Sequence, residues 1–254
     1  MEEKKELLNP VDLKEINFDE KTLFSAANDI LDSMLDFKEL MLEYSSAIRE
    51  IKTKFLILDQ EFQVRNDRNP ISNIQTRLKS QVSIMQKLER KGIGISREEV
   101  QENIRDIAGI RVICSYVDDI YRLAEALIKQ TDIELVERKD YIMNPKPNGY
   151  RSLHLIVRVP VFFEESVRKV YAEVQIRTIS MDFWASLEHQ MKYKKKISNP
   201  EEISAKLKRC AEVNAYTDMM MLEIRKEMDG IEDEKSDVDQ LLDKVKRFGI
   251  SLTE

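Results

Sequence analysis

Two segments with a period of two constrain the fold of this chain most strongly. Apolar residues at the even positions from Val170 to Ile176 alternate with Tyr171, Glu173, Gln175 and Arg177. This alternation is typical of a β-strand that packs one face on a core. The sequence therefore predicts a sheet whose other face carries several reactive side chains.

The preceding segment, around 150–155, has the same character. Tyr150, Ser152 and His154 are expected to share one face of a strand next to the first. An aromatic ring, an imidazole, a carboxylate, an amide and a guanidinium then converge, as binding sites require. An ordinary solvated sheet face is the alternative, and the convergence favours a site.

Composition excludes several classes of protein. The chain has 254 residues and a net charge of −6, which disfavours a general coat for nucleic acid or anionic membranes. It contains neither a signal-peptide pattern nor an apolar run long enough to span a membrane, so we expect a cytoplasmic protein. Its two cysteines and two histidines disfavour a structural zinc site.

Periodicity and turn residues predict an α/β (α+β) fold: a small mixed sheet flanked by helices, with long terminal helices. Asn69 is expected to cap a helix over 71–91 that has Pro70 in its first turn and ends at Gly92. The remaining predicted elements are helices over 19–63, 97–108, 118–130 and 179–193, strands over 110–116 and 133–141, and two helical segments after Pro200.

A local excess of basic residues runs against the net charge. Eight basic and five acidic side chains lie between Ile71 and Arg111. Lys79, Ser83 and Lys87 recur at helical spacing, which suits phosphate oxygens, although a solvated helix face has the same pattern. No GxxxxGK[ST] motif occurs, so a nucleotide would be held without a P-loop.

Two carboxylates are candidate metal ligands. Asp106 precedes a predicted strand, and Glu173 lies within another. Together they can offer hard oxygen ligands to Mg²⁺, which leaves its other positions to water and phosphates. Alternatively, Asp106 only pairs with Arg105 or Arg111. Tyr150 follows a stiff loop and is either a platform for a base or a half-buried strand residue.

Five separated motifs, in order, resemble the synthetase domain of the Rel-type alarmone, or (p)ppGpp, synthetases over about 69–193. They are Arg77-Leu-Lys-Ser80, Asp106-Ile-Ala-Gly-Ile-Arg111, Gly149-Tyr-Arg-Ser-Leu-His154, Glu173-Val-Gln-Ile-Arg-Thr178 and Trp184-Ala-Ser-Leu-Glu-His189. The resemblance implies a nucleotidyltransferase-like domain that transfers pyrophosphate from ATP to the 3′-hydroxyl of GDP or GTP and releases AMP.

The resemblance also implies roles for individual residues. Asp106 and Glu173 would hold Mg²⁺, and Glu173 would be the base. Arg77 and Arg111 would flank the adenine, while Lys79, Ser83 and Lys87 would reach the ATP phosphates. The residues implied for the guanine nucleotide are Lys139, Lys146, Tyr150, His154, Gln175, Arg177, Asp182 and Ala185. Some relatives have asparagine at the position of Asp182; aspartate can also accept the guanine N1–H and N2–H.

The resemblance further implies a small, synthesis-only enzyme, because no His-Asp dipeptide of a hydrolase domain occurs. We expect a helical extension over 1–68, a catalytic domain over 69–195 and an oligomerisation segment over 196–254, which would form homotetramers. Transfer to another 3′-hydroxyl, such as that of tRNA, and a catalytically idle nucleotide- or RNA-binding regulator are the alternatives. The acidic net charge disfavours tRNA.

Overall fold

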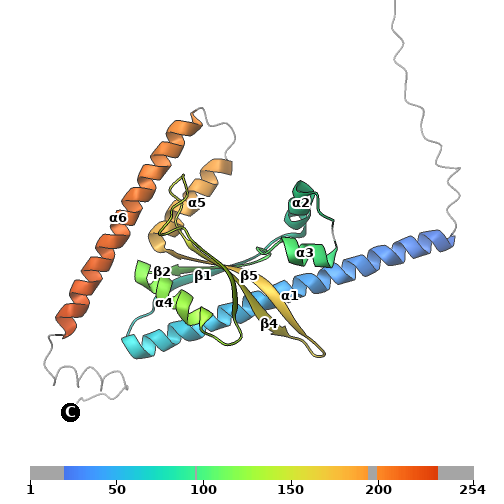
Figure 1. Cartoon of the computed structure of the whole chain (residues 1–254), viewed down its shortest axis with the longest axis horizontal. Helices are drawn as coiled ribbons and strands as arrows, with labels where there is room; N and C mark the ends of the chain where they lie inside the picture. The colour runs from blue at the N-terminus through green and yellow to red at the C-terminus, as the bar shows by residue number, and fades with distance from the viewer. Residues whose placement is uncertain (1–19, 95, 194–198, 234–254) are drawn as a thin grey trace, which may run out of the picture. The chain divides into compact units, whose positions relative to one another are not determined.

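The computed structural model describes residues 20–94, 96–193 and 199–233. Its elements, coloured along the chain in Figure 1, are α1 (Glu20–Asn66), β1 (Ile71–Leu78), α2 (Gln81–Lys91), α3 (Arg97–Asn103), β2 (Ala108–Cys114), α4 (Val117–Ile128), β3 (Glu134–Asp140), β4 (Leu153–Phe162), β5 (Val167–Thr178), α5 (Ile179–Tyr193) and α6 (Pro200–Asp233). The structure divides after Leu42 into two units, and the features below belong to the second.

A five-stranded mixed sheet in the order β1-β2-β5-β4-β3 is the centre of this unit. β2 and β5 pair in parallel, whereas the other neighbouring strands pair antiparallel. The parallel register sets Gly109 opposite Glu173 and Arg111 opposite Gln175. β4 and β5 are neighbours, as the sequence predicts, with His154 opposite Gln175.

The core lies on the apolar face of this sheet. Val170, Ala172, Val174 and Ile176 of β5 are buried. α4 contacts β2 and β5 and buries Ile120, Leu123 and Leu127 completely. The period of two in β5 therefore places Glu173 and Gln175 on the opposite face.

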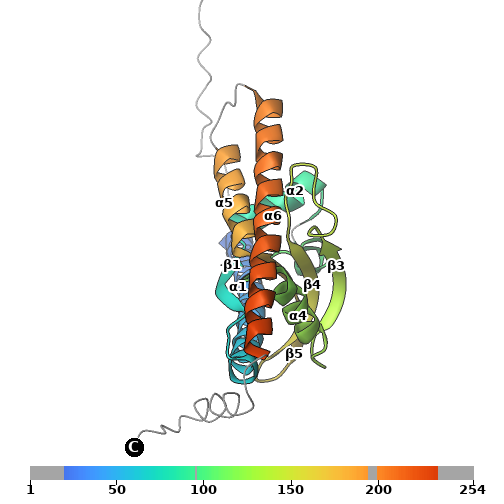
Figure 2. The ribbon, with the colours of Figure 1, turned by 90° about the vertical axis from the view of Figure 1, so that its left-hand side faces the viewer.

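α5 and α6 run side by side, as both ribbon views show (Figures 1 and 2). Trp184 of α5 and Ala211 of α6 belong to a separate small buried cluster. Among the described residues, none of the helices is long and apolar enough to cross a membrane.

The predicted helix over 71–91 is wrong in its first half. Residues Ile71–Leu78 form the edge strand β1, and only Gln81–Lys91 are helical. Ile74 and Leu78 have helical spacing, but antiparallel hydrogen bonds to β2 decide the conformation of this segment. Asn69 therefore caps no helix, and the carbonyl of Pro70 accepts from the Ser115 amide at the edge of the sheet. Ser80 is the N-cap of α2, and Gly92 ends it with a φ of 66°.

Other boundaries shift less. The helix predicted over 97–108 ends at Asn103, and the strand predicted over 110–116 runs from Ala108 to Cys114. Of the stretch after Pro200, where two helical segments are expected, the structure describes the helix α6 to Asp233. The predicted helices over 19–63, 118–130 and 179–193 and the strand over 133–141 are confirmed within a few residues. Predictions for 234–254 lie outside the described residues.

Candidate active site

A cavity of about 330 Å³ opens on the polar face of the sheet, where β1, β2 and β5 lie next to one another. Six of the predicted site residues line it: Arg77, Lys79, Asp106, Arg111, Glu173 and Gln175. The glycine at 109 allows the strands to approach closely, because a Cβ there would lie 3.3 Å from the carbonyl oxygen of Arg77. Asp106 and Glu173 thus share one cavity although 67 positions separate them in the chain.

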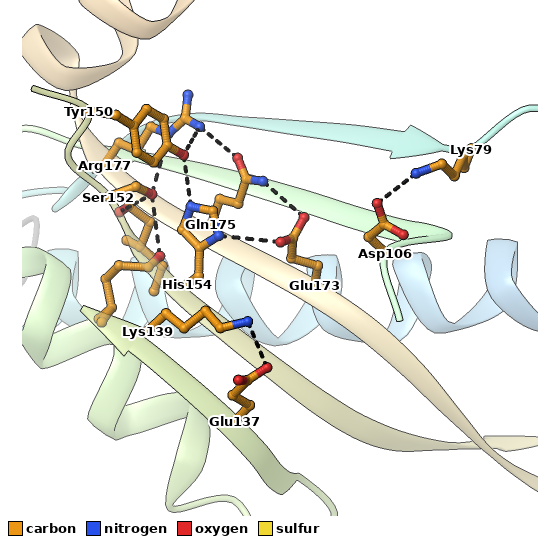
Figure 3. Close-up of polar contacts among 12 residues, drawn as sticks. Lys79, Asp106, Glu137, Lys139, Tyr150, Ser152, His154, Glu173, Gln175 and Arg177 are labelled. Carbon is orange, nitrogen blue, oxygen red and sulfur yellow. Dashed lines mark hydrogen bonds and ion pairs between the residues drawn. The ribbon is translucent and has the colours of Figure 1, made fainter. Parts of the chain in front are cut away.

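Asp106 is held by two lysines. Its Oδ2 lies 2.6 Å from the Nζ of Lys79, and its Oδ1 lies 2.8 Å from the Nζ of Lys87 (Figure 3 draws the first pair). Burial acts to raise the pKa of the Asp106 carboxyl, but the hydrogen bonds from both lysines outweigh it, and the pKa lies below its ordinary value. Asp106 therefore pairs with neither Arg105 nor Arg111, and the lysines of the predicted ladder meet on this carboxylate.

Glu173 is oriented by two different neighbours. The Nε2 of Gln175 donates to its Oε2 at 2.9 Å, and the Nδ1 of His154 lies 3.3 Å from its Oε1. Burial acts to raise the pKa of Glu173, as does the charge of Asp106, but hydrogen bonds from His154 and Gln175 lower it overall. Both carboxyl groups are consequently ionised at neutral pH and close enough to influence each other.

This donor set fits Mg²⁺. Two ionised carboxylates in one cavity are the ligands that Mg²⁺ takes from a protein when water and phosphates complete its coordination. No group of three or more histidine, cysteine or carboxylate side chains that could hold a metal ion occurs in the part of the chain that the structure describes. The arrangement thus matches an ion shared with a substrate better than a closed structural site.

A chain of hydrogen bonds leads from Arg177 to Glu173 (Figure 3). The NH2 group of Arg177 donates to the Tyr150 hydroxyl at 2.5 Å, and that hydroxyl lies 2.8 Å from the Nε2 of His154. An ionised Glu173 carboxylate can only accept a hydrogen bond, so the Nδ1 of His154 must carry the proton directed at it. The Nε2 of a neutral imidazole then accepts from the Tyr150 hydroxyl. Arg177 also donates to the Oε1 of Gln175 at 2.8 Å, so both neighbours of Glu173 are oriented by one guanidinium.

Tyr150 and Ser152 differ from the prediction in their local structure. β4 begins only at Leu153, so both residues lie in the loop before the strand. They still belong to the constellation, since the Nε of Arg177 donates to the Ser152 hydroxyl at 3.4 Å. The ammonium of Lys146 lies over the Tyr150 ring, 4.9 Å from its centroid, and 4.6 Å from the centroid of Tyr141.

Asp182 lies between two arginines of the site, Arg111 of β2 and Arg177 of β5. Its Oδ1 is 3.2 Å from the NH1 of Arg111 and 3.2 Å from the NH1 of Arg177. Burial and the nearby Arg177 cation lower the pKa of Arg111. The Nε of Arg111 is buried without a hydrogen-bond partner among the described residues, so a donor remains for a ligand at the cavity.

Three predicted residues lie farther out. Lys139 pairs with Glu137 at 3.0 Å and is opposite His154 in the β3–β4 register. The Ser83 hydroxyl lies 2.9 Å from that of Ser80 at the start of α2. Ala185 is buried in the cluster with Trp184 and Ala211. Neither Ser83 nor Ala185 is part of the described cavity wall.

Gln75 and Thr76 of β1 also line the cavity and were not among the predicted site residues. Because residues 71–78 were predicted to be helical, these two side chains were not expected to face the sheet residues of the site. The alternation of Ile74, Thr76 and Leu78 with Gln75 and Arg77 is the signal for a strand that overlapped with the helical spacing.

The chain is similar to known proteins over most of its length. The region found in RelA / SpoT proteins matches residues 76–198. GTP pyrophosphokinase YwaC of Bacillus subtilis is 47% identical over 202 residues, which cover 80% of this chain and 96% of that protein.

Solved structures give the same result. Small alarmone synthetase 2 from Bacillus subtilis is similar with a TM-score of 0.68 and 46% identity, over 76% of this chain and 99% of that one. Small alarmone synthetase 1 from the same organism, bound to its product pppGpp, has a TM-score of 0.68 and 35% identity, over 76% and 97% of the two chains. This chain therefore belongs to the RelA/SpoT family, and its similarity to the small alarmone synthetases extends over almost their whole length.

Proposed function

We propose that this chain is a GTP pyrophosphokinase that transfers pyrophosphate from ATP to the 3′-hydroxyl of GDP or GTP, making ppGpp or pppGpp and AMP. The observation that carries the proposal is the shared cavity of Asp106 and Glu173. Cationic side chains gather beside Asp106, and the tyrosine–histidine network leads to Glu173. The activity of the relatives named above supports the same assignment.

ATP is assigned to the side of the site formed by β1, β2 and α2. Arg77 and Arg111 line the cavity and suit the faces of an adenine, because a guanidinium stacks well on planar rings. Lys79 and Lys87 pair with Asp106 and would turn to the ATP phosphates when an ion binds this carboxylate. Ser83 lies one turn before Lys87 on α2 and is also assigned to the ATP phosphates.

The guanine nucleotide is assigned to the side formed by the loop before β4 and the start of α5. Tyr150 supplies a ring for stacking, and Lys146 lies above that ring. Lys139 and His154, opposite each other on β3 and β4, are assigned to the phosphates and ribose. Asp182 offers a carboxylate oxygen to the guanine edge, with Ala185 one turn farther along α5.

In the reaction, the acceptor 3′-oxygen bonds to the β-phosphorus of ATP, and the bond from that phosphorus to the oxygen bridging the α-phosphate breaks. AMP leaves with the bridging oxygen, and Glu173 receives the hydroxyl proton. A lowered pKa keeps Glu173 ionised and ready to accept it. Asp106 and Glu173 would hold Mg²⁺, which supplies neutralisation of the polyphosphate charge.

The proposed oligomer is a homotetramer built through α6. Val213, Tyr216, Met220 and Ile224 are between 41% and 64% exposed. Their spacing of three and four places them on one stripe of the helix, away from the buried Ala211 and Asp218. A second copy of this chain is the proposed occupant. The division into an extension over 1–68, a catalytic domain over 69–195 and an assembly segment over 196–254 remains part of this proposal.

A transfer assay tests the activity. Purified protein receives ATP labelled in its β-phosphate together with GDP, GTP or tRNA. We expect label in the guanine nucleotide, an equal amount of AMP, and no reaction in excess EDTA until Mg²⁺ is restored. Label in tRNA would support the alternative acceptor, and binding of both nucleotides without transfer would identify an idle regulator.

A further inference from the structure

The loop that carries Tyr150 packs directly on α6. Gly149, next to the tyrosine, has a φ of 90°, which favours glycine. A Cβ on Gly149 would lie 2.6 Å from the Cβ of Ala211 and 3.2 Å from the Cα of Lys208. The first distance is shorter than real carbon atoms allow, so the glycine backbone lies against the helix with no room for a methyl group.

Hydrogen bonds hold the same surfaces together. The NH1 of Arg151, on the other side of Tyr150, donates to the Ala211 carbonyl at 3.3 Å. The indole Nε1 of Trp184 donates to the Leu207 carbonyl at 2.8 Å. α6 is therefore bonded both to the loop and to α5.

The Tyr150 ring is connected to this contact. It packs against the buried cluster of Trp184, Ala185 and Ala211, and its centroid lies 6.5 Å from that of Trp184. Its other neighbours are Arg177 and His154, which bond its hydroxyl. The ring is thus held between the catalytic network on one side and the α6-supported cluster on the other.

Farther along, α6 is bound to the junction of β5 and α5. The Thr178 hydroxyl donates to the Oδ2 of Asp218 at 2.8 Å, and the Ser180 hydroxyl donates to the Asn214 carbonyl at 3.2 Å. The contacts at 207, 211, 214 and 218 follow one face of the helix. Because several independent bonds fix this face, α6 can act as a rigid support for the loop.

We infer that α6 is a structural part of the acceptor subsite and that Ala211 is a positioning residue for Tyr150. The inference rests on the proposed function, which assigns the guanine base to Tyr150. A larger side chain at 211 has no free space toward Gly149, so it displaces the loop and the tyrosine with it. Asp106, Arg77 and Lys79, which are assigned to ATP, lie on other elements, so this displacement acts on the acceptor side of the site and through the Tyr150–His154 hydrogen bond.

The test compares Ala211→Val with Ala205→Val. Both substitutions add the same two methyl groups to α6, but Ala205 is exposed. For Ala211→Val we expect the KM for GDP and GTP to rise about tenfold while the KM for ATP changes less than about twofold, since overpacking acts on one subsite only. Ala205→Val should match the wild type in both constants.

A binding readout separates this inference from the proposed reaction. Trp184 is the only tryptophan of the chain, so its fluorescence reports on the contact among Tyr150, α5 and α6. Titration with GDP alone, without ATP, should change the emission of the wild type at lower concentration than that of Ala211→Val. If the wild-type protein shows no transfer, the proposed function fails. If the wild type transfers normally, and Ala211→Val has the same KM for GDP and the same GDP concentration for the change in emission, this inference fails.

Should Ala211→Val not fold, as judged by circular dichroism, Ala211→Ser provides the same comparison with a single added atom. We expect a smaller rise in the KM for GDP in the same direction. Equal rises in the KM for GDP and ATP in either folded variant would overturn the positioning role and indicate general destabilisation.

Discussion

The neighbours of Glu173 keep its carboxylate ionised and fix its orientation. His154 and Gln175 each bond one of its oxygens, and Arg177 controls both through the Tyr150 hydroxyl and the Gln175 amide. A carboxylate in such a setting serves as a base only if its charge and its orientation are both retained.

Glu173→Gln removes the charge and the base while keeping the shape of the side chain. We expect transfer from ATP to GDP to fall by about 10²- to 10⁴-fold or more, as for loss of a general base. The thermal unfolding midpoint should stay near that of the wild type. A variant that retains most of its turnover would exclude Glu173 as the base.

Tyr150 combines a ring for stacking with a hydroxyl that hydrogen-bonds to both Arg177 and His154. Tyr150→Ala should raise the KM for GDP and GTP by roughly tenfold or more, because stacking on an aromatic ring contributes roughly 1–3 kcal/mol per base. The KM for ATP should change little. Steady-state kinetics with each substrate varied in turn provides the measurement.

Tyr150→Phe is the matched control, since it keeps the ring and removes only the link between Arg177 and His154. It should retain the KM for GDP and lose part of kcat. Equal losses of GDP and ATP affinity in Tyr150→Ala would reject the stacking role.

At the scale of elements, the attachment of α6 contains a pH-sensitive group. Asp218 is 8% exposed, and burial raises its pKa to about 6, although the Thr178 hydroxyl and the Arg151 charge act against this shift. The folded protein thus binds a proton at Asp218 more tightly than the unfolded chain does. The stability from this group is complete below the unfolded pKa and is lost as pH rises through about 6.

Asp218→Asn removes that dependence and keeps an oxygen that can accept from Thr178. We expect the variant to be more stable than the wild type at pH 7.5 by on the order of 1–3 kcal/mol, with the difference shrinking toward about pH 5. Urea unfolding at several pH values measures this. A constant difference across the range would show that Asp218 is ionised throughout in the folded protein.

The helix–strand boundary near residue 78 shows why element prediction failed where it did. The apolar residues of segment 71–78 have a spacing compatible with both a helix and a strand. Because β1 is an edge strand with few buried residues, its sequence lacks the regular apolar alternation of a buried strand. Pairing with β2, from Leu78 opposite Ala108 back to Ile71, selects the strand. By contrast β5 is central, buries one complete face and was predictable from its alternation alone.

At the scale of the whole molecule, the apolar stripe of α6 is the proposed assembly surface. Met220→Lys places a charge in the middle of that stripe, where burial against another copy would be costly. If the proposed assembly is correct, light scattering should show a smaller species for this variant than for the wild-type protein at equal concentration. Ser204→Lys, at an exposed position on another side of α6, should leave the assembly intact. An unchanged mass for Met220→Lys would show that this stripe of α6 is not the assembly surface.

The family and the reaction it implies were predictable from the sequence, as were most of the residues proposed for the site, because they stand in short motifs and in strands whose alternation is visible locally. Tertiary structure alone decided that Lys79 and Lys87 meet on Asp106, that Asp182 lies between Arg111 and Arg177, and that Ala211 supports Gly149. Each of these contacts joins residues from different elements. Their distances depend on strand order and helix docking, which local periodicity does not encode.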